Sequence, residues 1–128
     1  MSEHHGTIHW TELNTHEPKE AMAFYRELCG WTWQSVPMGD GTDYHLAMKG
    51  EEIVAGVFDM SNVPEMAEIP SHWFTYIAVS DLDASIETTK AAGGTIHREA
   101  FEVEGTGRFA IVEDAVGAVF GIMTPNPM

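Results

Sequence analysis

The sequence predicts an α+β fold of two βαβββ modules in one pseudo-symmetric domain of 128 residues. The main observation is an internal repeat, in which residues 10–13 (WTEL) return as residues 74–77 (FTYI), an offset of 64 positions. In both copies an acidic residue, a helical segment and a glycine follow, and Gly30 matches Gly94. A repeat of half the chain indicates one architecture used twice. The second observation is that strand-like segments follow each helical segment in the same order.

In the first module, residues 7–14 are expected to form a strand, and Pro18 to begin a helix that Gly30 ends. Four residues of this helix recur with the spacing i, i+3, i+4, i+7, which predicts one buried face. They are Ala21, Phe24, Tyr25 and Leu28. Three strands should follow, with turns at Gly39–Gly41 and at Gly50-Glu51. These strands are predicted at residues 31–36, 44–48 and 53–58.

A link with two prolines, residues 60–71, separates the first module (about 6–59) from the second (about 72–124). The second module should contain a strand at 72–79 and a helix at 81–92. Three helix residues are expected to face inward: Leu82, Ile86 and Thr89. Further strands are predicted at 95–103, 108–112 and 118–123, with a turn at 104–107.

The chain is strongly acidic, with six Lys and Arg against 20 Asp and Glu and a formal net charge of −14. Such a surface repels nucleic acids and anionic membranes, so neither is expected as a partner. No apolar run is long enough to cross a bilayer, the N-terminal residues lack the features of a signal peptide, and the single Cys29 has no disulfide partner. No phosphate loop or dinucleotide-binding glycine pattern is present. A soluble, cytoplasmic protein without a cofactor is predicted.

Several short motifs occur in a fixed order along nearly the whole chain. The first module carries Leu13 four residues before Glu17, then Phe24-Tyr25 and Cys29-Gly30-Trp31. The second carries residues 79–81 (VSD), 92–94 (AGG) and 112–117 (VEDAVG). In this order the sequence resembles the vicinal oxygen chelate superfamily, which includes glyoxalase I, bleomycin-resistance proteins and extradiol dioxygenases. The resemblance implies strands that curl around a concave cleft, often completed across a homodimer, and a homodimer is therefore expected.

The resemblance also implies where metal-dependent members carry their ligands. The corresponding positions in this chain are Trp10, Gly56, Phe74 and Gly121, although the repeat offset would place the second at Val57. None of these side chains has the imidazole, carboxylate or thiolate group that binds a divalent cation. The usual metal site of the superfamily is therefore expected to be absent.

The period-2 alternation of a strand places Trp10, Glu12 and Asn14 on one face and Leu13 on the face that packs against a helix. By the repeat, Phe74 and Tyr76 share the face of Trp10. Aromatic residues with few polar groups are typical of a site for a small, partly apolar organic molecule. The predicted ligand-binding residues are Trp10, Asn14, Phe74, Gly56 and Gly121. Core packing is the alternative role of Trp10 and Phe74.

Glu12 and, at its repeat position, Tyr76 are the candidates for catalysis. A carboxylate on an inward face is costly unless it is paired, and such groups often serve in acid–base chemistry. The alternative is a structural pair between Glu12 and a nearby Tyr, His or Arg108, and Tyr76 could be that partner. A further alternative is a noncanonical metal site of Glu12 with His45 and His72.

The favoured function is that of a glyoxalase- or bleomycin-resistance-like protein that binds a small organic molecule in an aromatic cleft, without the usual metal. The alternative is an enzyme of the superfamily, a lyase, isomerase or oxygenase that uses Glu12 as acid or base, or a noncanonical metal. In a third reading the cleft is filled by side chains, and the protein is a structural or regulatory subunit. The ligand itself does not follow from the sequence.

Overall fold

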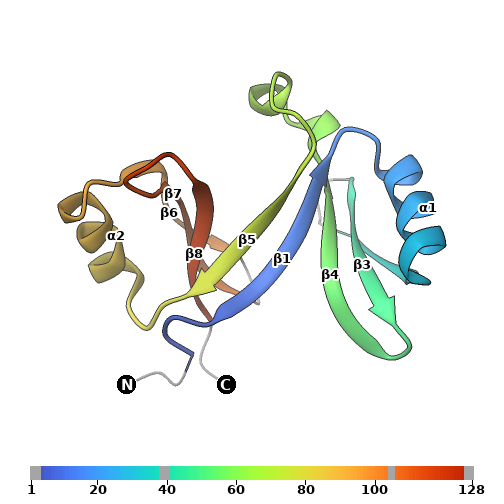
Figure 1. The fold of residues 1–128 in the computed structure, drawn as a ribbon, viewed down its shortest axis with the longest axis horizontal. Helices are drawn as coiled ribbons and strands as arrows, with labels where there is room; N and C mark the ends of the chain where they lie inside the picture. The colour runs from blue at the N-terminus through green and yellow to red at the C-terminus, as the bar shows by residue number, and fades with distance from the viewer. Residues whose placement is uncertain (1–3, 38–40, 104–105, 126–128) are drawn as a thin grey trace. The chain divides into compact units, whose positions relative to one another are not determined.

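The computed structural model describes residues 4–37, 41–103 and 106–125. Within these residues the chain forms two α-helices, eight β-strands and two short 3-10 turns (Figure 1). The predicted α+β class and the repeated βαβββ order are confirmed. The chain divides into two compact units, one of which is Thr11–Trp73 and the other the residues up to Trp10 together with those from Phe74 onward. No helix in the described part of the chain combines the length and apolar character needed to cross a bilayer.

The unit Thr11–Trp73 contains the elements of the first module. They are β1 (Ile8–Thr15, from Thr11 onward), α1 (Pro18–Cys29), β2 (Thr32–Pro37), β3 (Asp43–Lys49) and β4 (Glu52–Asp59). Strands β2, β3 and β4 pair antiparallel in chain order, and β4 pairs parallel with β1. The link that follows holds the 3-10 turns Met60–Asn62 and Pro64–Met66. The predicted turn at Gly39–Gly41 lies largely outside the described residues.

The other unit contains the elements of the second module. They are β5 (His72–Ala78, from Phe74 onward), α2 (Leu82–Ala91), β6 (Thr95–Val103), β7 (Gly107–Glu113) and β8 (Val119–Pro125). Strand β5 pairs parallel with β8, and β8, β7 and β6 pair antiparallel. Both modules therefore have the strand order first, fourth, third, second, which confirms the repeat at the level of topology. The predicted turn at 104–107 lies partly outside the described residues.

Helix α2 packs on its sheet as the sequence predicts. Leu82 and Ile86 are 1% and 5% exposed, whereas Thr89 is half-buried. The two buried residues belong to a core cluster with residues that lead into α2 or lie on β7 and β8: Val79, Ala110, Val112 and Ile122. The apolar spacing of this helix therefore identified the buried positions correctly.

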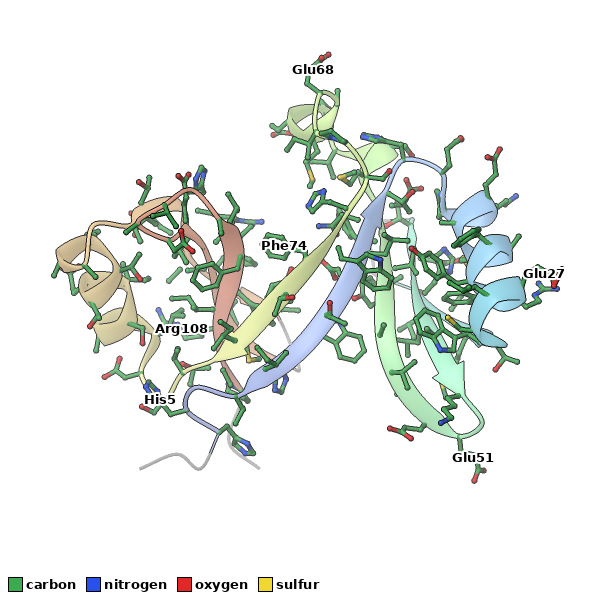
Figure 2. All side chains as sticks on the ribbon, viewed as in Figure 1. His5, Glu27, Glu51, Glu68, Phe74 and Arg108 are labelled. Atoms are coloured by element: carbon green, nitrogen blue, oxygen red, sulfur yellow. The ribbon has the colours of Figure 1, made fainter. Side chains whose placement is uncertain are left out.

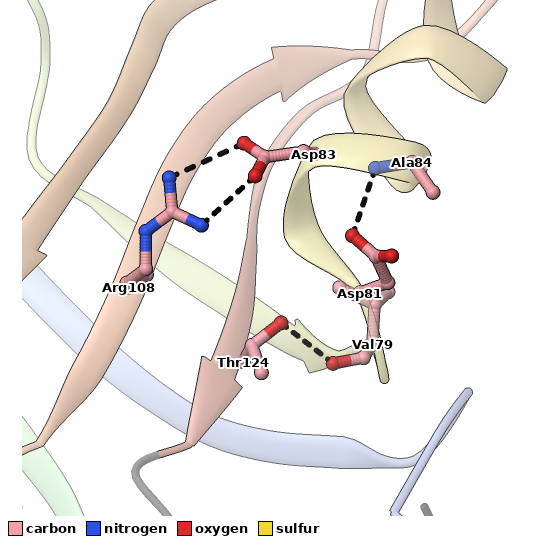
Figure 3. A network of polar contacts seen from close by, with 6 residues as sticks. All are labelled: Val79, Asp81, Asp83, Ala84, Arg108 and Thr124. Atoms are coloured by element: carbon pink, nitrogen blue, oxygen red, sulfur yellow. Dashed lines mark hydrogen bonds and ion pairs between the residues drawn. The ribbon is translucent and has the colours of Figure 1, made fainter. Parts of the chain in front are cut away.

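Polar contacts hold the start of α2 against the sheet (Figure 3). The Asp81 carboxylate caps the helix by accepting a hydrogen bond from the Ala84 N–H at 3.0 Å. On the neighbouring turn, the Arg108 guanidinium on β7 donates two hydrogen bonds of 3.2 Å to the Asp83 carboxylate. The hydrogen bond from Arg108 and, second, its positive charge lower the pKa of Asp83. Both partners are largely exposed, so this ion pair orients α2 more than it stabilises the fold.

The predicted buried face of α1 is wrong. Phe24 and Leu28 are 58% and 66% exposed, and no described residue of α1 is fully buried. Tyr25 is half-buried because it contacts two residues outside the helix: its ring stacks on Trp31 with centroids 5.6 Å apart, and its hydroxyl accepts a hydrogen bond of 3.1 Å from the Trp73 indole. Glu27 extends from the side of α1 that is turned away from the strands (Figure 2). The spacing indicated an amphipathic helix but not which partners its apolar stripe would find.

The sequence repeat matched Gly30 with Gly94, but in the structure the glycine that corresponds to Gly30 at the end of the helix is Gly93. Gly30 ends α1 in the left-handed conformation with φ 73°, but after α2 it is Gly93 that has this conformation, with φ 93°. Gly94 serves a close approach instead, because a Cβ there would lie 2.6 Å from the Glu113 carbonyl oxygen. The two helix ends are therefore offset by one residue from the repeat.

The turn between β7 and β8 gives a testable pH dependence at Asp114. Its carboxylate accepts hydrogen bonds from the backbone N–H groups of Ala118 and Val116 at 3.0 and 2.9 Å, and these bonds lower its pKa. A carboxyl group with a lowered folded pKa stabilises the fold above its unfolded value of about 3.9, and this contribution is lost as the pH falls through the folded pKa.

We therefore expect Asp114→Asn, which keeps an acceptor oxygen, to remove the part of the acid-side loss of stability that Asp114 causes. Urea unfolding at a series of pH values from neutral to acid measures this loss for the original chain and the variant. Identical pH profiles for the two proteins would contradict the role assigned to this carboxylate.

Candidate functional site

The parallel strand pairs define which positions of the two modules correspond. Glu12 lies beside Gly56 in the pair β1/β4, and Tyr76 lies beside Gly121 in the pair β5/β8. Because Glu12 and Tyr76 are repeat partners, Gly56 corresponds to Gly121. Val57, the position that the repeat offset indicated, pairs with Leu13 and is 1% exposed. Val57 therefore lies on the face that carries Leu13, and the offset is wrong by one residue at this strand.

In the unit Thr11–Trp73, a tyrosine ring lies over Gly56. A Cβ at Gly56 would overlap the hydroxyl and ring of Tyr44. Tyr44 reaches this place because Leu46, two residues further along β3, pairs with Gly56 and so shares its face. The Tyr44 hydroxyl donates a hydrogen bond of 2.7 Å to the Glu12 carboxylate. The absence of a side chain at Gly56 is what allows this hydrogen bond.

Glu12 is therefore a buried, paired carboxylate, only 8% exposed. The sequence predicted a nearby Tyr, a His or Arg108 as the structural partner of Glu12. The partner is a tyrosine, but it is Tyr44, which the sequence analysis did not name. Arg108, another candidate, forms its ion pair with Asp83. The signal that could have found Tyr44 is its place on a strand next to a glycine-bearing strand, but this signal has meaning only once the register is known.

Asn14 is the second buried polar residue on this face, 5% exposed. Its amide nitrogen lies 3.4 Å from Nε2 of His72, whose Nδ1 lies 2.7 Å from the Pro70 carbonyl oxygen. Since a carbonyl only accepts, His72 carries its proton on Nδ1, and Nε2 accepts from Asn14. The amide oxygen of Asn14 is buried and has no hydrogen-bond partner among the described residues. An acceptor left in this way favours a donor from a ligand or a water molecule.

A matching tyrosine–glycine contact occurs in the other unit. A Cβ at Gly121 would overlap the ring of Tyr76 and lie 3.2 Å from Cε2 of Phe74. Phe74, labelled on β5 in Figure 2, is 7% exposed, and its ring meets that of Tyr76 edge-on with centroids 5.1 Å apart. Phe109 continues this aromatic row, 5.5 Å from Tyr76. Trp10, also in this unit, is half-buried on β1.

The residues considered for a noncanonical metal site do not converge. His45 pairs with Val57 and therefore lies on the Leu13 face of the sheet, whereas Glu12 shares the opposite face with Gly56. His45 Nδ1 is 2.7 Å from the hydroxyl of Ser35, its pairing partner on β2, which lies on the same Leu13 face. In the part of the chain that the structure describes, no group of three or more His, Cys, Asp and Glu is placed to hold a metal ion.

The divalent cation of metal-dependent superfamily members also does not fit the four corresponding positions. Trp10 and Phe74 have no suitable donor atom, and the positions on β4 and β8 are glycines. The rings of Tyr44 and Tyr76 lie where ligand side chains at Gly56 and Gly121 would project. All four positions consequently lack ligand atoms, and the two glycine positions also lack the space for a ligand side chain.

The contact between Tyr44 and Gly56 can be tested by stability measurements. Gly56→Ala should destabilise the fold by about 1–3 kcal/mol, because the new methyl group must displace the Tyr44 ring. The double variant Tyr44→Ala/Gly56→Ala should lose less unfolding free energy than the sum of the losses of the two single variants, because without the Tyr44 ring the new methyl group meets no clash. Urea unfolding of all four proteins measures the coupling, and strictly additive costs would show that the ring does not pack on Gly56.

Comparisons with known proteins agree with this fold. A model of the Glyoxalase/Bleomycin resistance protein/Dioxygenase superfamily matches residues 7–122. A Mycobacterium bovis protein named "Putative glyoxylase CFP32" is 37% identical over 122 residues, which are 95% of this chain and 45% of that protein. "Anthracycline biosynthesis protein DnrV" of Streptomyces peucetius is 27% identical over 133 residues, with 96% of this chain and 48% of that protein covered. The chain spans about half the length of the curated relatives it matches.

Solved structures show the same fold at low sequence identity. Methylmalonyl-CoA epimerase from Mycobacterium tuberculosis has a TM-score of 0.64 at 18% identity, over 99% of this chain and 93% of that chain. Hypothetical protein BH1468 from Bacillus halodurans C-125 has a TM-score of 0.67 at 12% identity, over 96% of each chain. Since the family model spans most of the sequence, the chain belongs to the Glyoxalase/Bleomycin resistance protein/Dioxygenase superfamily.

Proposed function

We propose that this chain binds a small, partly apolar organic molecule without the metal ion of the superfamily's metal-dependent members. The observation that carries the proposal is the tyrosine ring over each of two corresponding glycines, Tyr44 over Gly56 and Tyr76 over Gly121. Where a metal ligand would project, each module instead has an aromatic surface. Such a surface favours the apolar part of an organic molecule over a hydrated cation.

Two buried polar groups of the unit Thr11–Trp73 support an organic ligand with a few hydrogen-bonding groups. The buried Asn14 amide oxygen is an acceptor without a partner in the described chain, and the Glu12 carboxylate is held by Tyr44. Trp10, Phe74 and the two glycines are the remaining proposed ligand-binding positions, in the cleft that the superfamily resemblance implies. Few polar groups in an apolar surface are what orient ligands in small-molecule sites. One relative is named for anthracycline biosynthesis, which suggests planar aromatic compounds as the first ligands to examine.

An anthracycline, which is planar and fluorescent, is a suitable probe. We expect saturable quenching of Trp fluorescence at micromolar concentration, and a loss of affinity of at least about fivefold in Trp10→Ala, equivalent to about 1 kcal/mol. Phe74→Leu should weaken binding similarly while it keeps the buried position filled. Trp31→Phe, in the aromatic group next to α1, is the matched control and should bind normally. Unchanged affinity in Trp10→Ala and Phe74→Leu would refute the proposed site.

The second candidate function is that of an enzyme, and the buried pair of Glu12 and Tyr44 favours it. A carboxylate with a hydroxyl donor 2.7 Å away can accept a proton from a substrate carbon or oxygen while the hydroxyl stays positioned beside it. The reaction would be of the isomerase or lyase type, since both begin with proton transfer. Tyr76 is the second proposed catalytic residue, because it occupies the position in the other module that corresponds to Glu12.

Proton exchange separates the two candidate functions. If Glu12 is a base, the protein should accelerate deuterium uptake from D₂O at the carbon next to the carbonyl of hydroxyacetone. Glu12→Gln should abolish this acceleration, and Tyr44→Phe should reduce it. Elemental analysis of protein purified without added metal belongs to the same experiment, because stoichiometric Zn, Ni, Fe or Mn would contradict the metal-free proposal. No exchange above the solvent rate would favour binding alone.

The homodimer and the cytoplasmic location stay predictions from the sequence. Several exposed apolar side chains lie on or beside α1, among them Phe24, Leu28 and Trp73. Burial of such residues is a common basis of association between subunits. Sedimentation equilibrium measures the oligomeric state directly, and a monomer at all concentrations would contradict the predicted dimer.

A further inference from the structure

A cavity of about 650 Å³ lies between α1 and strands β2–β4, within the unit Thr11–Trp73. It is lined by His45 and therefore opens on the Leu13 face of the sheet, opposite the face of Glu12 and Gly56. From its lining we infer that this cavity is a second binding site, which takes a small organic carboxylate with an apolar body. The site does not depend on the function proposed for the opposite face.

Helix α1 presents to the cavity an apolar surface with a charged residue at each end. Lys19, Met22, Ala23 and Arg26 all line it, and their spacing of i, i+3, i+4, i+7 puts them on one side of the helix. The two charged residues are one at each end, and the two apolar residues lie between them. This side of α1 therefore offers apolar contact along its middle and a cation at either end.

The two ends of the cavity differ in charge. In the β3/β4 register His45 pairs with Val57, so Asp43 and Asp59, which line the cavity two residues further on, lie at one common end. Asp59 is partly engaged there, since its carboxylate accepts a hydrogen bond of 2.9 Å from the Ser61 N–H. At the other end, Trp33 on β2 pairs with Ala47, two residues beyond His45 and away from Asp43, and Arg26 is in the last turn of α1. Lys19, in the first turn of α1, offsets one of these two carboxylates, whereas the lining residues at the Arg26 end include no carboxylate, so an anion is favoured at the Arg26 end.

Arg26 has no carboxylate within ion-pair distance among the described residues, and neither has Lys19. Lys49 and Arg98 also lack such an ion pair in the described part of the chain, so what distinguishes Arg26 and Lys19 is that both line the cavity. A guanidinium binds a carboxylate through two parallel hydrogen bonds, a geometry that a lysine cannot offer. Arg26 is thus the residue expected to hold the carboxylate group.

Trp33 forms the apolar wall at the same end of the cavity. Its ring meets that of Trp31 edge-on, with centroids 6.1 Å apart, which holds it in place. Its indole N–H is buried and has no acceptor in the part of the chain that the structure describes. A carboxylate oxygen that reaches this N–H would offset the cost of the unpaired donor. The planar body of the ligand would then lie between Trp33 and the Met22–Ala23 side of α1.

Benzoate and its uncharged analogue benzamide are the probes for this site. Benzoate should shift the indole N–H resonance of Trp33, assigned with Trp33→Phe, in a saturable manner with a millimolar dissociation constant. Benzamide should bind about tenfold more weakly, the equivalent of losing one charge-assisted contact. Equal affinity for both probes, or no saturable shift with benzoate up to its solubility limit, would overturn the inference.

Three variants identify the residues involved. Arg26→Gln should weaken benzoate binding about tenfold, whereas Lys49→Gln, which removes a cation from β3 outside the cavity, should bind as the original chain does. Met22→Trp, which narrows the middle of the cavity with a larger side chain, should weaken binding while the circular dichroism spectrum stays unchanged. Tyr44→Phe, on the opposite face, should leave benzoate binding intact. Normal benzoate binding by Arg26→Gln or by Met22→Trp would refute the site, whatever the outcome for the opposite face.

Discussion

The parallel pairing of the first and fourth strands within each module is the constraint on which the rest of the structure depends. It sets Glu12 beside Gly56 in one unit and Tyr76 beside Gly121 in the other. Because neither glycine has a Cβ, a tyrosine ring can pack directly on the backbone. The hydrogen bond from Tyr44 to Glu12 and the row of aromatic rings around Tyr76 both follow from this close approach.

The same register separates two kinds of chemistry on the two faces of one strand. On β3, Tyr44 reaches the buried carboxylate of Glu12, whereas His45, the next residue, lines the cavity below α1. A strand turns successive side chains to opposite faces, so one residue is enough to exchange one environment for the other. This is why a metal site of Glu12 and His45, plausible from residue types alone, does not form. On the His45 face, α1 has no fully buried described residue, and polar side chains line the cavity beneath it.

Much of the fold followed from local patterns in the sequence. The helices begin and end within one residue of the predicted positions because local signals act there: Pro18 begins α1, Gly30 ends it, and the Asp81 carboxylate caps α2. The strands lie within two residues of their predicted bounds because turns delimit them. The apolar stripe of α1 was assigned to a buried face, but Phe24 and Leu28 are exposed, since a spacing rule describes one helix and not the surface beneath it.

The sequence by itself determined the order of elements and the repeat, since these depend on residue types and on short-range spacing. At the four positions that the superfamily resemblance indicates for metal ligands, the residue types also showed that ligand atoms are lacking. Tertiary structure alone decided that Tyr44 pairs with Glu12, 32 residues away. It also decided that Gly56, rather than Val57, corresponds to Gly121. The physical reason is that strand register arises from hydrogen bonds and packing between distant segments, and a shift of one residue reverses every side chain. Residue types therefore indicated which chemistry was available, and the register decided which groups meet.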